Sequence, residues 1–358
     1  MTSPSYDLAE LGWDAAWQAA FAPYAGDAIP GRIVRVDRSL CGVLTPTGLV
    51  RASLGGAALE AVATDALAAP CTGDWCAVRH WSDGPSTVEV LLPRRSAVTR
   101  ADARGTSRGQ VLAANVDVVA LVVALHPEPN LARIERLLSL AWQSGGAPVV
   151  VLTKADLVGD VGHLADDVRR AAPGVPVVCT STVTGAGMDA VADLLAGGKT
   201  MALLGVSGHG KSSLTNALVG VDVLAIRDIR SDGKGRHTTV RRELLLVPGR
   251  GAVIDTPGLR GVGLQESGEG VAAAFPDIES LVDDCRFSDC GHASEPGCAV
   301  QAAVSDGTLP VRRLESWQAL RREQRWMASR TDARLRSERQ QQWKRLTKAT
   351  RAGRRAGR

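Results

Sequence analysis

The sequence predicts a multidomain protein in which a small β-barrel comes first, an α/β domain follows and a Cys/His-rich helical module ends the chain. Three observations support this order. Short apolar segments broken by Gly, Asp and Pro fill residues 28–100, and strand-like segments alternate with helical ones between 113 and 262. A cluster of three cysteines and one histidine then precedes an Arg-rich end. We expect an N-terminal extension at 1–26, the barrel at 27–100, the α/β domain at 101–265 and the helical module with a basic tail at 266–358.

Five short β segments predict the barrel, at 31–36, 41–44, 48–51, 73–78 and 86–92. Strands of this length and number suit an OB-fold, a barrel type whose surface often binds oligonucleotides. A fragment of a β-sandwich without a binding role is the alternative. Basic and aromatic side chains of this part are candidates for RNA contact, namely Arg32, Arg35, Arg51, Arg79, Trp75 and Trp81.

A change of period predicts the α/β domain. Apolar runs of strand length alternate with segments of helical spacing, which is typical of a parallel sheet covered by helices on both faces. The expected strands lie at 116–125, 148–152, 175–179, 200–205 and 252–254, and the expected helices at 131–143, 162–172 and 187–196.

The string GVSGHGKS at 205–212 predicts a phosphate-binding loop. Gly205 and Gly210 permit the backbone turns that aim N–H groups at phosphates. Lys211 places a cation between the β- and γ-phosphates, Ser212 offers Mg²⁺ a hydroxyl, and the following helix directs its positive end inward. The remaining loop contacts are expected from Ser207, Gly208, His209 and Ser213.

Two further strings suit the γ-phosphate side of such a site. In DTPG at 255–258, Asp255 is expected as an outer-shell Mg²⁺ ligand, and Gly258 can present its N–H to the γ-phosphate. In GRHTT at 235–239, we expect Thr239 to complete the Mg²⁺ shell, with Thr238 as the alternative, and His237 to approach the attacking water. A hairpin loop with incidental threonines, and a histidine that contacts solvent or RNA, are the alternatives.

No glutamine follows DTPG, where many GTPases place the residue that orients the water. We therefore expect slow intrinsic hydrolysis that a partner accelerates. The chain then runs through 263–276 into the Cys/His-rich module, so the nucleotide state is expected to reorient that module. A passive linker is the alternative.

The string TKAD at 153–156 selects guanine in this interpretation. Asp156 can accept from guanine N1–H and from the exocyclic amine, Lys154 can cover the base, and Thr153 stands where asparagine is usual. Ser181 and Thr182 are expected to bring a backbone N–H to guanine O6. Because TKAD precedes the phosphate loop instead of following it, the sequence predicts a circularly permuted domain that binds GTP and GDP with Mg²⁺.

Four residues in a Cys-x4-Cys-x-His-x5-Cys pattern predict a zinc site: Cys285, Cys290, His292 and Cys298. Three thiolates and one imidazole match a structural tetrahedral Zn²⁺ ion with no open position. Scattered core cysteines are the alternative, and Cys41, Cys71, Cys76 and Cys179 are expected to be ordinary packing residues.

The charge is distributed unevenly along the chain. Residues 311–358 contain sixteen Lys/Arg and four Asp/Glu, or +12, which leaves −8 of the net +4 for the rest. A basic tail favours an anionic partner such as RNA, with a solvated, frayed helix as the alternative. The N-terminus does not have the pattern of a signal peptide, and no apolar run has the length of a membrane span. We expect a cytoplasmic monomer with no membrane association.

The motifs together resemble those of the ribosome small-subunit-dependent GTPase family called RsgA or YjeQ. The resemblance covers nearly the whole chain and includes GDW at 73–75, the permuted motifs and the spacing of the zinc ligands. Thr153, His209 and Val240 depart from the family pattern. The resemblance implies a late assembly factor that binds the nearly mature small ribosomal subunit and its rRNA near the decoding region, hydrolyses GTP in response, and leaves.

Three other functions are compatible with parts of the sequence. One is a non-ribosomal GTPase switch whose barrel binds a protein or an unrelated RNA. Another is a P-loop ATPase or nucleotide kinase, and the third is a zinc-dependent nucleic-acid-binding module with a vestigial phosphate loop. Small-subunit stimulation, guanine selectivity and measured turnover distinguish these functions.

Overall fold

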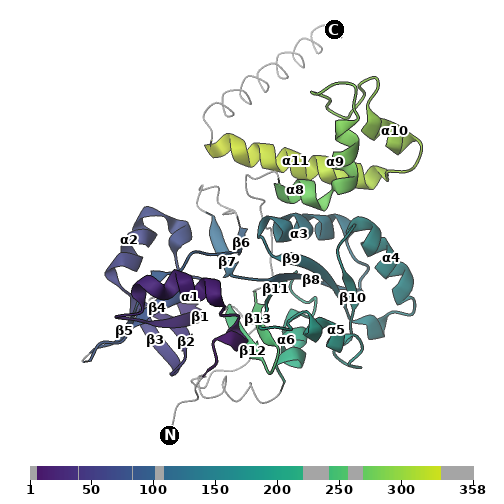
Figure 1. The fold of residues 1–358 in the computed structure, drawn as a ribbon. Coiled ribbons are helices and arrows are strands. Elements are labelled where there is room, and N and C mark those ends of the chain that lie inside the picture. The colour runs from purple at the N-terminus through teal and green to yellow at the C-terminus, as the bar shows by residue number, and fades with distance from the viewer. Residues whose placement is uncertain are drawn as a thin grey trace, which may run out of the picture.

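The structure is a computed structural model that describes residues 6–38, 40–82, 84–100, 109–220, 242–256 and 269–331. Figure 1 shows the barrel at one end, the α/β domain in the middle and the helical module above helix α3. His237, Thr239, Gly258 and the tail beyond residue 331 lie outside the described residues. Among the described helices, none is long and apolar enough to cross a membrane.

Five strands close the predicted barrel: β1 (Ile29–Asp37), β2 (Leu40–Thr45), β3 (Gly48–Leu54), β4 (Trp75–Arg79) and β5 (Ser86–Leu91). Strand β1 pairs antiparallel with both β2 and β4, and β3 runs parallel to β5. The closed order β1-β2-β3-β5-β4 confirms the expected barrel. Helix α2 (Gly56–Thr64) and the short 3-10 helix η3 (Ala66–Ala68), which no sequence pattern predicted, connect β3 to β4.

The N-terminal extension packs aromatic side chains against the barrel. It contains η1 (Ala9–Leu11), α1 (Ala15–Phe21) and η2 (Ala22–Tyr24). Trp13 meets Trp75 edge to face with ring centroids 4.8 Å apart, and the tilted ring of Trp17 lies 6.1 Å from the same indole. Such aromatic contacts bury a large apolar area and hold the extension in place.

Arg32 joins three segments of the chain. Its guanidinium donates to Gly73 O at 3.4 Å, to Asn115 O at 3.0 Å and to Leu11 O. Arg32 is 2% exposed and Trp75 is 1% exposed, so the prediction that these two residues contact RNA is wrong. Trp81, which is 49% exposed and lies under Arg79, keeps the predicted surface position.

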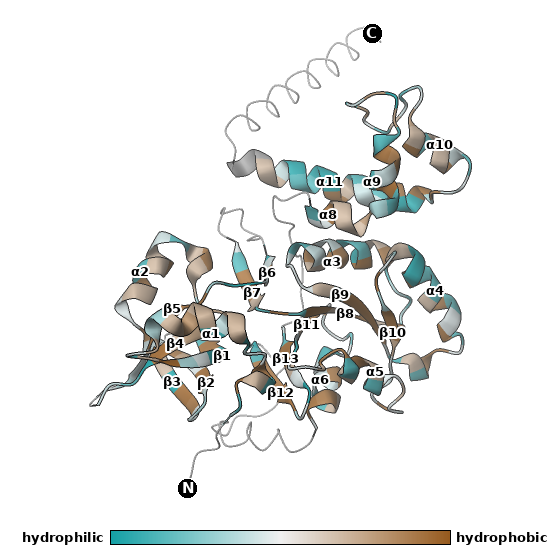
Figure 2. Cartoon of the chain, in the orientation of Figure 1, coloured by the Kyte–Doolittle hydropathy of each residue, from teal (hydrophilic) through white to brown (hydrophobic). Residues whose placement is uncertain are grey.

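The α/β domain contains the parallel strands β8 (Val118–Ala124), β9 (Ala147–Thr153), β10 (Val177–Cys179), β11 (Thr200–Leu204) and β13 (Gly251–Asp255). Helices α3 (Leu131–Gln143) and α4 (Val161–Ala171) cover one face, and α5 (Met188–Asp193) and α6 (Lys211–Val219) cover the other (Figure 1). Alternate residues of the strands point to two separate cores, Val119 and Leu121 towards α3, and Ala120 and Val122 towards α6. In Figure 2 the strands between the helices are accordingly the most hydrophobic part of the domain.

Two additional elements link this domain to the barrel. Strand β12 (Glu243–Val247) runs antiparallel to β13 and meets β1 at the pair Arg35 and Glu243, so one sheet runs from the domain into the barrel. The hairpin of β6 (Ala97–Arg100) and β7 (Gln110–Ala114), which was not predicted, connects the two units along the chain.

The helical module consists of α8 (Glu269–Ala274), α9 (Pro276–Asp283), α10 (Ala299–Ser305) and α11 (Val311–Thr331). Gly270 of α8 lies so close to α3 that a Cβ atom on it would come within 2.2 Å of Ser139 O. Arg313 of α11 donates to the fully buried carboxylate of Glu135 on α3 at 3.0 Å and pairs with Asp277 of α9. Close packing and buried charge therefore join the module to the α/β domain.

Candidate functional site

The predicted nucleotide motifs meet at one edge of the parallel sheet. The phosphate loop follows β11, TKAD begins at the last residue of β9, and Asp255 ends β13. Strand β11 lies between β8 and β13, and β9 lies on the other side of β8. Ligands of open α/β sheets bind outside the carboxyl ends of the strands. Although the motifs follow an unusual order along the chain, they lie at neighbouring strand ends in space, where one nucleotide could contact all of them.

The phosphate loop is tightly constrained at its ends. Gly205 and Gly210 have positive φ angles, and a Cβ atom on Gly205 would lie 2.4 Å from Val122 O. The Lys211 ammonium group donates to Gly205 O at 2.8 Å and to Val206 O at 3.1 Å. Burial lowers the pKa of Lys211 against the opposing effect of Asp255. The loop thus holds a buried cation where nucleotide phosphates would lie.

The remaining loop residues differ in their exposure to solvent. Ser207 and Gly208 are exposed at the tip of the loop, and Ser212 and Ser213 are exposed in the first turn of α6. His209 is half-buried beneath the loop. An exposed tip leaves backbone N–H groups accessible to phosphate oxygens, in keeping with the predicted roles of these residues.

Two oxygen-bearing side chains lie side by side where the phosphate loop meets the end of β13. The Ser212 hydroxyl lies 3.4 Å from Asp255 Oδ2, and Asp255 is 3% exposed at the end of β13. A hydroxyl beside a carboxylate fits the oxygen-rich, water-retaining coordination of Mg²⁺ bound with nucleotide phosphates. Thr256 donates to Leu203 O and so anchors the end of β13 to β11.

The predicted guanine-reading residues come together from two loops. The Ser181 hydroxyl donates to Asp156 Oδ1 at 2.5 Å, and the N–H groups of Val183 and Thr184 each donate to Ser181 Oγ at 3.2 Å. Lys154 has φ +61°, and Thr182 is exposed beside Ser181. The turn at 181–184 therefore orients the carboxylate of Asp156 at the edge of the site.

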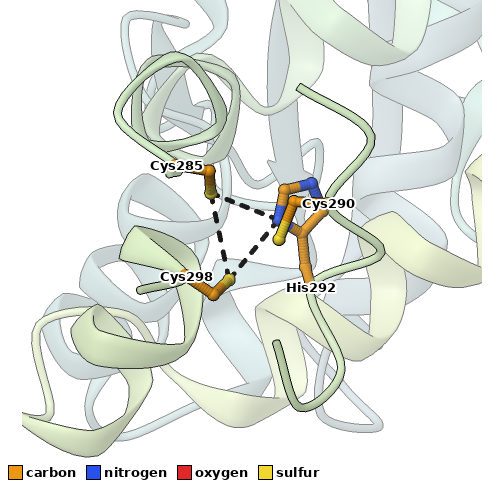
Figure 3. Close-up of side chains that lie close together, drawn as sticks. All are labelled: Cys285, Cys290, His292 and Cys298. Carbon is orange, nitrogen blue, oxygen red and sulfur yellow. Dashed lines mark hydrogen bonds between the residues drawn. The ribbon is translucent and has the colours of Figure 1, made fainter. Parts of the chain in front are cut away.

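The four predicted zinc ligands form one cluster, as Figure 3 shows. His292 Nδ1 lies 3.6 Å from both Cys285 Sγ and Cys298 Sγ, and these two sulfurs are 3.9 Å apart. Tetrahedral Zn²⁺ with ordinary bond lengths separates two sulfurs by about 3.8 Å and a sulfur from a nitrogen by about 3.6 Å. The side chains, including Cys290 within the same cluster, therefore fit a structural zinc ion.

Surrounding groups hold these ligands in place. Gln301 donates to His292 O at 2.7 Å, and the His292 ring meets Trp317 edge to face. Burial raises the pKa of Cys285, but the N–H groups of Val300 and Ala299 and the neighbouring thiols outweigh it, so the net pKa of Cys285 is lowered. Donors aimed at a sulfur favour its thiolate, which is the form that binds metal.

Comparison with known proteins identifies the family. The model of the RsgA GTPase family matches residues 91–265. A Streptomyces avermitilis protein named small ribosomal subunit biogenesis GTPase RsgA is 50% identical over 349 residues, which is 96% of this chain and 93% of that protein. The chain belongs to the RsgA GTPase family. An Opitutus terrae protein of the same name is 42% identical over 96% of this chain and 97% of its own length.

Solved structures agree with this membership in the RsgA family. The structure of YjeQ from Thermotoga maritima matches with a TM-score of 0.60 and 28% identity over 81% of this chain and 95% of that one. YloQ, described as a circularly permuted GTPase, matches with a TM-score of 0.57 and 25% identity over 86% of this chain and 96% of that one. The predicted permuted fold is therefore confirmed.

Two features of this RsgA-family chain went unrecognised in the sequence. Thr153 was assigned to the base site, but its hydroxyl donates to His209 O in the phosphate loop. Glu135 and Arg313 lie 178 positions apart in the sequence and no pattern links them. A charged residue, Glu135, lies on the apolar stripe of the helix at 131–143. This position was the one feature of the sequence that could have indicated a buried ion pair.

Proposed function

We propose that this chain is a GTPase of late small-subunit maturation, which hydrolyses GTP to GDP and phosphate when the small ribosomal subunit stimulates it. The observation that carries the proposal is the Asp156–Ser181 pair, which lies at the same sheet edge as the phosphate loop. A carboxylate held in this way suits the two adjacent donors of guanine. The names of the related proteins support the ribosomal part.

We assign three groups of residues to the reaction. The backbone of the phosphate loop and Lys211 bind the phosphates, and Ser212 and Asp255 would hold Mg²⁺, which neutralises charge on the transferred phosphoryl group. His237 and Thr239 remain proposals for water orientation and Mg²⁺ coordination. The nucleotide-binding set is Thr153, Lys154, Asp156, Ser181, Thr182, Gly205, Ser207, Gly208, His209, Gly210, Lys211, Ser212, Ser213, Asp255 and Gly258.

Contacts between the barrel and the start of β12 support stimulation by a partner. Thr72 of the barrel donates to Arg242 O at 3.4 Å, and Arg35 pairs with Glu243 across β1 and β12. These residues directly follow the segment assigned to the first switch. A subunit that binds the barrel would therefore act on the backbone that leads out of that switch.

The remaining assignments complete the proposal. The exposed Trp81 ring, on which the Arg79 guanidinium stacks, offers the barrel an aromatic face for rRNA. The Cys/His cluster holds one structural zinc ion, and the basic tail adds a second contact with rRNA. We propose a cytoplasmic monomer with the domain limits 1–26, 27–100, 101–265 and 266–358.

The decisive experiment measures GTP hydrolysis with and without purified small subunits, with large subunits and tRNA as control RNAs. We expect slow hydrolysis alone and strong stimulation by small subunits only. Asp156→Asn should lose the preference for GTP and gain xanthosine triphosphate, because an amide presents a donor where guanine also has one. Loss of stimulation in His237→Ala, with GTP binding kept, would support its role.

Other outcomes point to the competing functions. Equal stimulation by any RNA would favour a non-ribosomal GTPase switch. ATP turnover that Asp156→Asn leaves unchanged would favour an ATPase or kinase. Absence of turnover under all conditions would leave only a nucleic-acid-binding module.

A further inference from the structure

We propose that Glu295 is a positioning residue that holds the loop at 290–294 in the conformation in which Cys290 and His292 can bind zinc. The inference rests on the proposed zinc site and goes beyond its four ligands. The carboxylate of Glu295 does not bind the ion in this interpretation. It binds backbone groups on both sides of His292 and thereby sets where the imidazole lies.

Two of the zinc ligands lie at helix ends and two lie in a loop, as Figure 3 shows. Cys285 follows the end of α9, and Cys298 directly precedes α10. Cys290 and His292 lie between those helices in residues 284–298, all described by the structure, where no helix or strand fixes the backbone. The loop pair therefore needs other contacts to bring its sulfur and its nitrogen to the ion.

Glu295 binds three backbone N–H groups of this loop. Its Oε1 accepts from Gly291 N–H at 3.0 Å, and its Oε2 accepts from Ala293 N–H at 2.9 Å and from Ser294 N–H at 3.0 Å. Hydrogen bonds to an ionised carboxylate are about twice as strong as those between neutral groups. The backbone donors, Ala293 N–H first, lower the pKa of Glu295 to about 2, so the carboxylate is ionised at neutral pH. One side chain therefore ties together the residues before and after His292.

The backbone at His292 adopts a conformation that is costly for a residue with a side chain. His292 has φ +54°, in the left-handed region that residues other than glycine seldom occupy. The carboxylate also lies tightly against Gly291, where a Cβ atom would come within 2.8 Å of Glu295 Oε1. The hydrogen bonds of Glu295 to both neighbours of His292 offset the cost of that conformation. Their loss would release His292 towards ordinary backbone angles and move its Nδ1 away from the sulfurs.

The main chain of Glu295 reaches the last ligand in the sequence. Its carbonyl accepts from Cys298 N–H at 3.3 Å. Gln301 of α10 donates its backbone N–H to Cys298 Sγ at 3.4 Å and its side-chain amide to His292 O at 2.7 Å. Glu295 and Gln301 therefore each contact both the loop that contains His292 and the Cys298 end of the site.

The experiment compares Glu295→Gln with wild type in the full-length protein. The amide keeps the size of the side chain, but it has one acceptor oxygen, so its NH₂ group faces at least one backbone N–H. Competition with a chromophoric chelator measures the Kd of Zn²⁺, and the visible absorption of the Co²⁺ form reports the ligand geometry. We expect the Kd of Zn²⁺ to rise at least about tenfold, as for other groups that orient metal ligands. The absorption bands of the Co²⁺ form should shift, because Cys290 and His292 move relative to the ion.

Asp289→Asn is the matched control. Asp289 directly precedes Cys290 and is exposed. The substitution removes one negative charge beside the site, as Glu295→Gln does, but leaves the three N–H groups bound to Glu295. The Kd of Zn²⁺ should stay within about twofold of wild type, since exposed charges contribute little, and the Co²⁺ spectrum should not change.

A second variant tests the same contact without removing the carboxylate. Gly291→Ala places a methyl group where Glu295 Oε1 lies, so the carboxylate must leave the loop. We expect the same rise in the Kd of Zn²⁺ and the same spectral shift. Circular dichroism checks that each variant remains folded, and Gly291→Ala decides the matter if Glu295→Gln loses helical content.

Each contrary result has one meaning. A Kd of Zn²⁺ within about twofold of wild type in folded Glu295→Gln would overturn the inference. An equal loss of affinity in Asp289→Asn would show that only the negative charge matters and would overturn it as well. A raised Kd with an unchanged Co²⁺ spectrum would show that Glu295 stabilises the module without placing ligands. Absence of bound zinc in the wild-type chain would instead refute the proposed zinc site, so the two failures are distinguishable.

Discussion

Replacing Arg313 with methionine should loosen the helical module from the α/β domain. The guanidinium is 2% exposed and stacks on Phe275 at 4.6 Å. It donates to Glu135 at 3.0 Å, to Asp277 at 2.7 Å, and to Ala171 O and Ala274 O at 3.1 Å each. One side chain therefore holds α3, α4, α8 and α9 against α11.

The size of the effect follows from the partners left behind. Removing one member of a buried ion pair costs about 3–5 kcal/mol, chiefly because a buried charge loses its compensation. Glu135 is fully buried but keeps Arg312 at 3.0 Å, and the side chain of Asp277 is 38% exposed. Because both carboxylates keep a partner or solvent, the loss should lie at the lower end of this range. We therefore expect Arg313→Met to cost about 3 kcal/mol of stability.

Native-state hydrogen exchange is the appropriate assay, because a chain of several domains need not unfold in one step. Amides of α11 and α3 should exchange about 100-fold faster in Arg313→Met, while barrel amides remain unchanged. Arg169→Met removes an exposed pair with Asp166 and should change protection by less than about 1 kcal/mol.

A second variant tests the reasoning itself. Glu135→Leu combined with Arg313→Met removes the buried charge and its partner together, and should recover most of the lost protection. If Arg313→Met left α11 protection within about 0.5 kcal/mol of wild type, the ion pairs would not be what docks the module. If the amides of α11 were less protected in the double variant than in either single variant, an uncompensated buried charge would not be the cause of the loss.

Two further predictions concern the metal and the phosphate loop. Cys290→Ser should reduce bound zinc from one equivalent to a small fraction in metal analysis of the purified protein, because the site needs all four ligands. Cys179→Ser, which lies outside the cluster, should keep the full equivalent. Equal zinc contents in the two variants would argue against this site. Gly205→Ala should weaken GDP binding at least about tenfold in a titration, since its Cβ would collide with Val122 O at 2.4 Å. Gly26→Ala, where nothing lies within 4 Å, should bind GDP normally, and normal binding by Gly205→Ala would contradict the steric argument.

Local patterns in the sequence predicted the regular elements with little error. The helix at Leu131–Gln143 was predicted to the residue, because Asn130 caps its start and an apolar stripe runs along one side. The β-rich part, the alternating strands and the zinc ligands were also predicted. Helix α2 and the β6–β7 hairpin were missed, since neither has a distinctive apolar period.

The predicted coupling between the second switch and the helical module stays a prediction. The structure adds a physical link that bears on it. Helix α8, which follows residues 257–268, ends at Ala274, whose carbonyl accepts from Arg313. A movement of α8 would therefore strain the bonds that hold α11, and the Arg313 variants measure that connection.

The sequence by itself predicted the chemistry of this protein, because the candidate ligands for phosphate, guanine and zinc occur in short strings whose spacing survives permutation. The tertiary structure alone decided which of the predicted site residues have another role. Arg32 and Trp75 are buried and pack between segments of the chain, and the Thr153 hydroxyl donates to the phosphate loop. Arg313 found its carboxylate 178 positions away. Such contacts depend on which strand ends and helix faces become neighbours, and local sequence carries no record of that proximity.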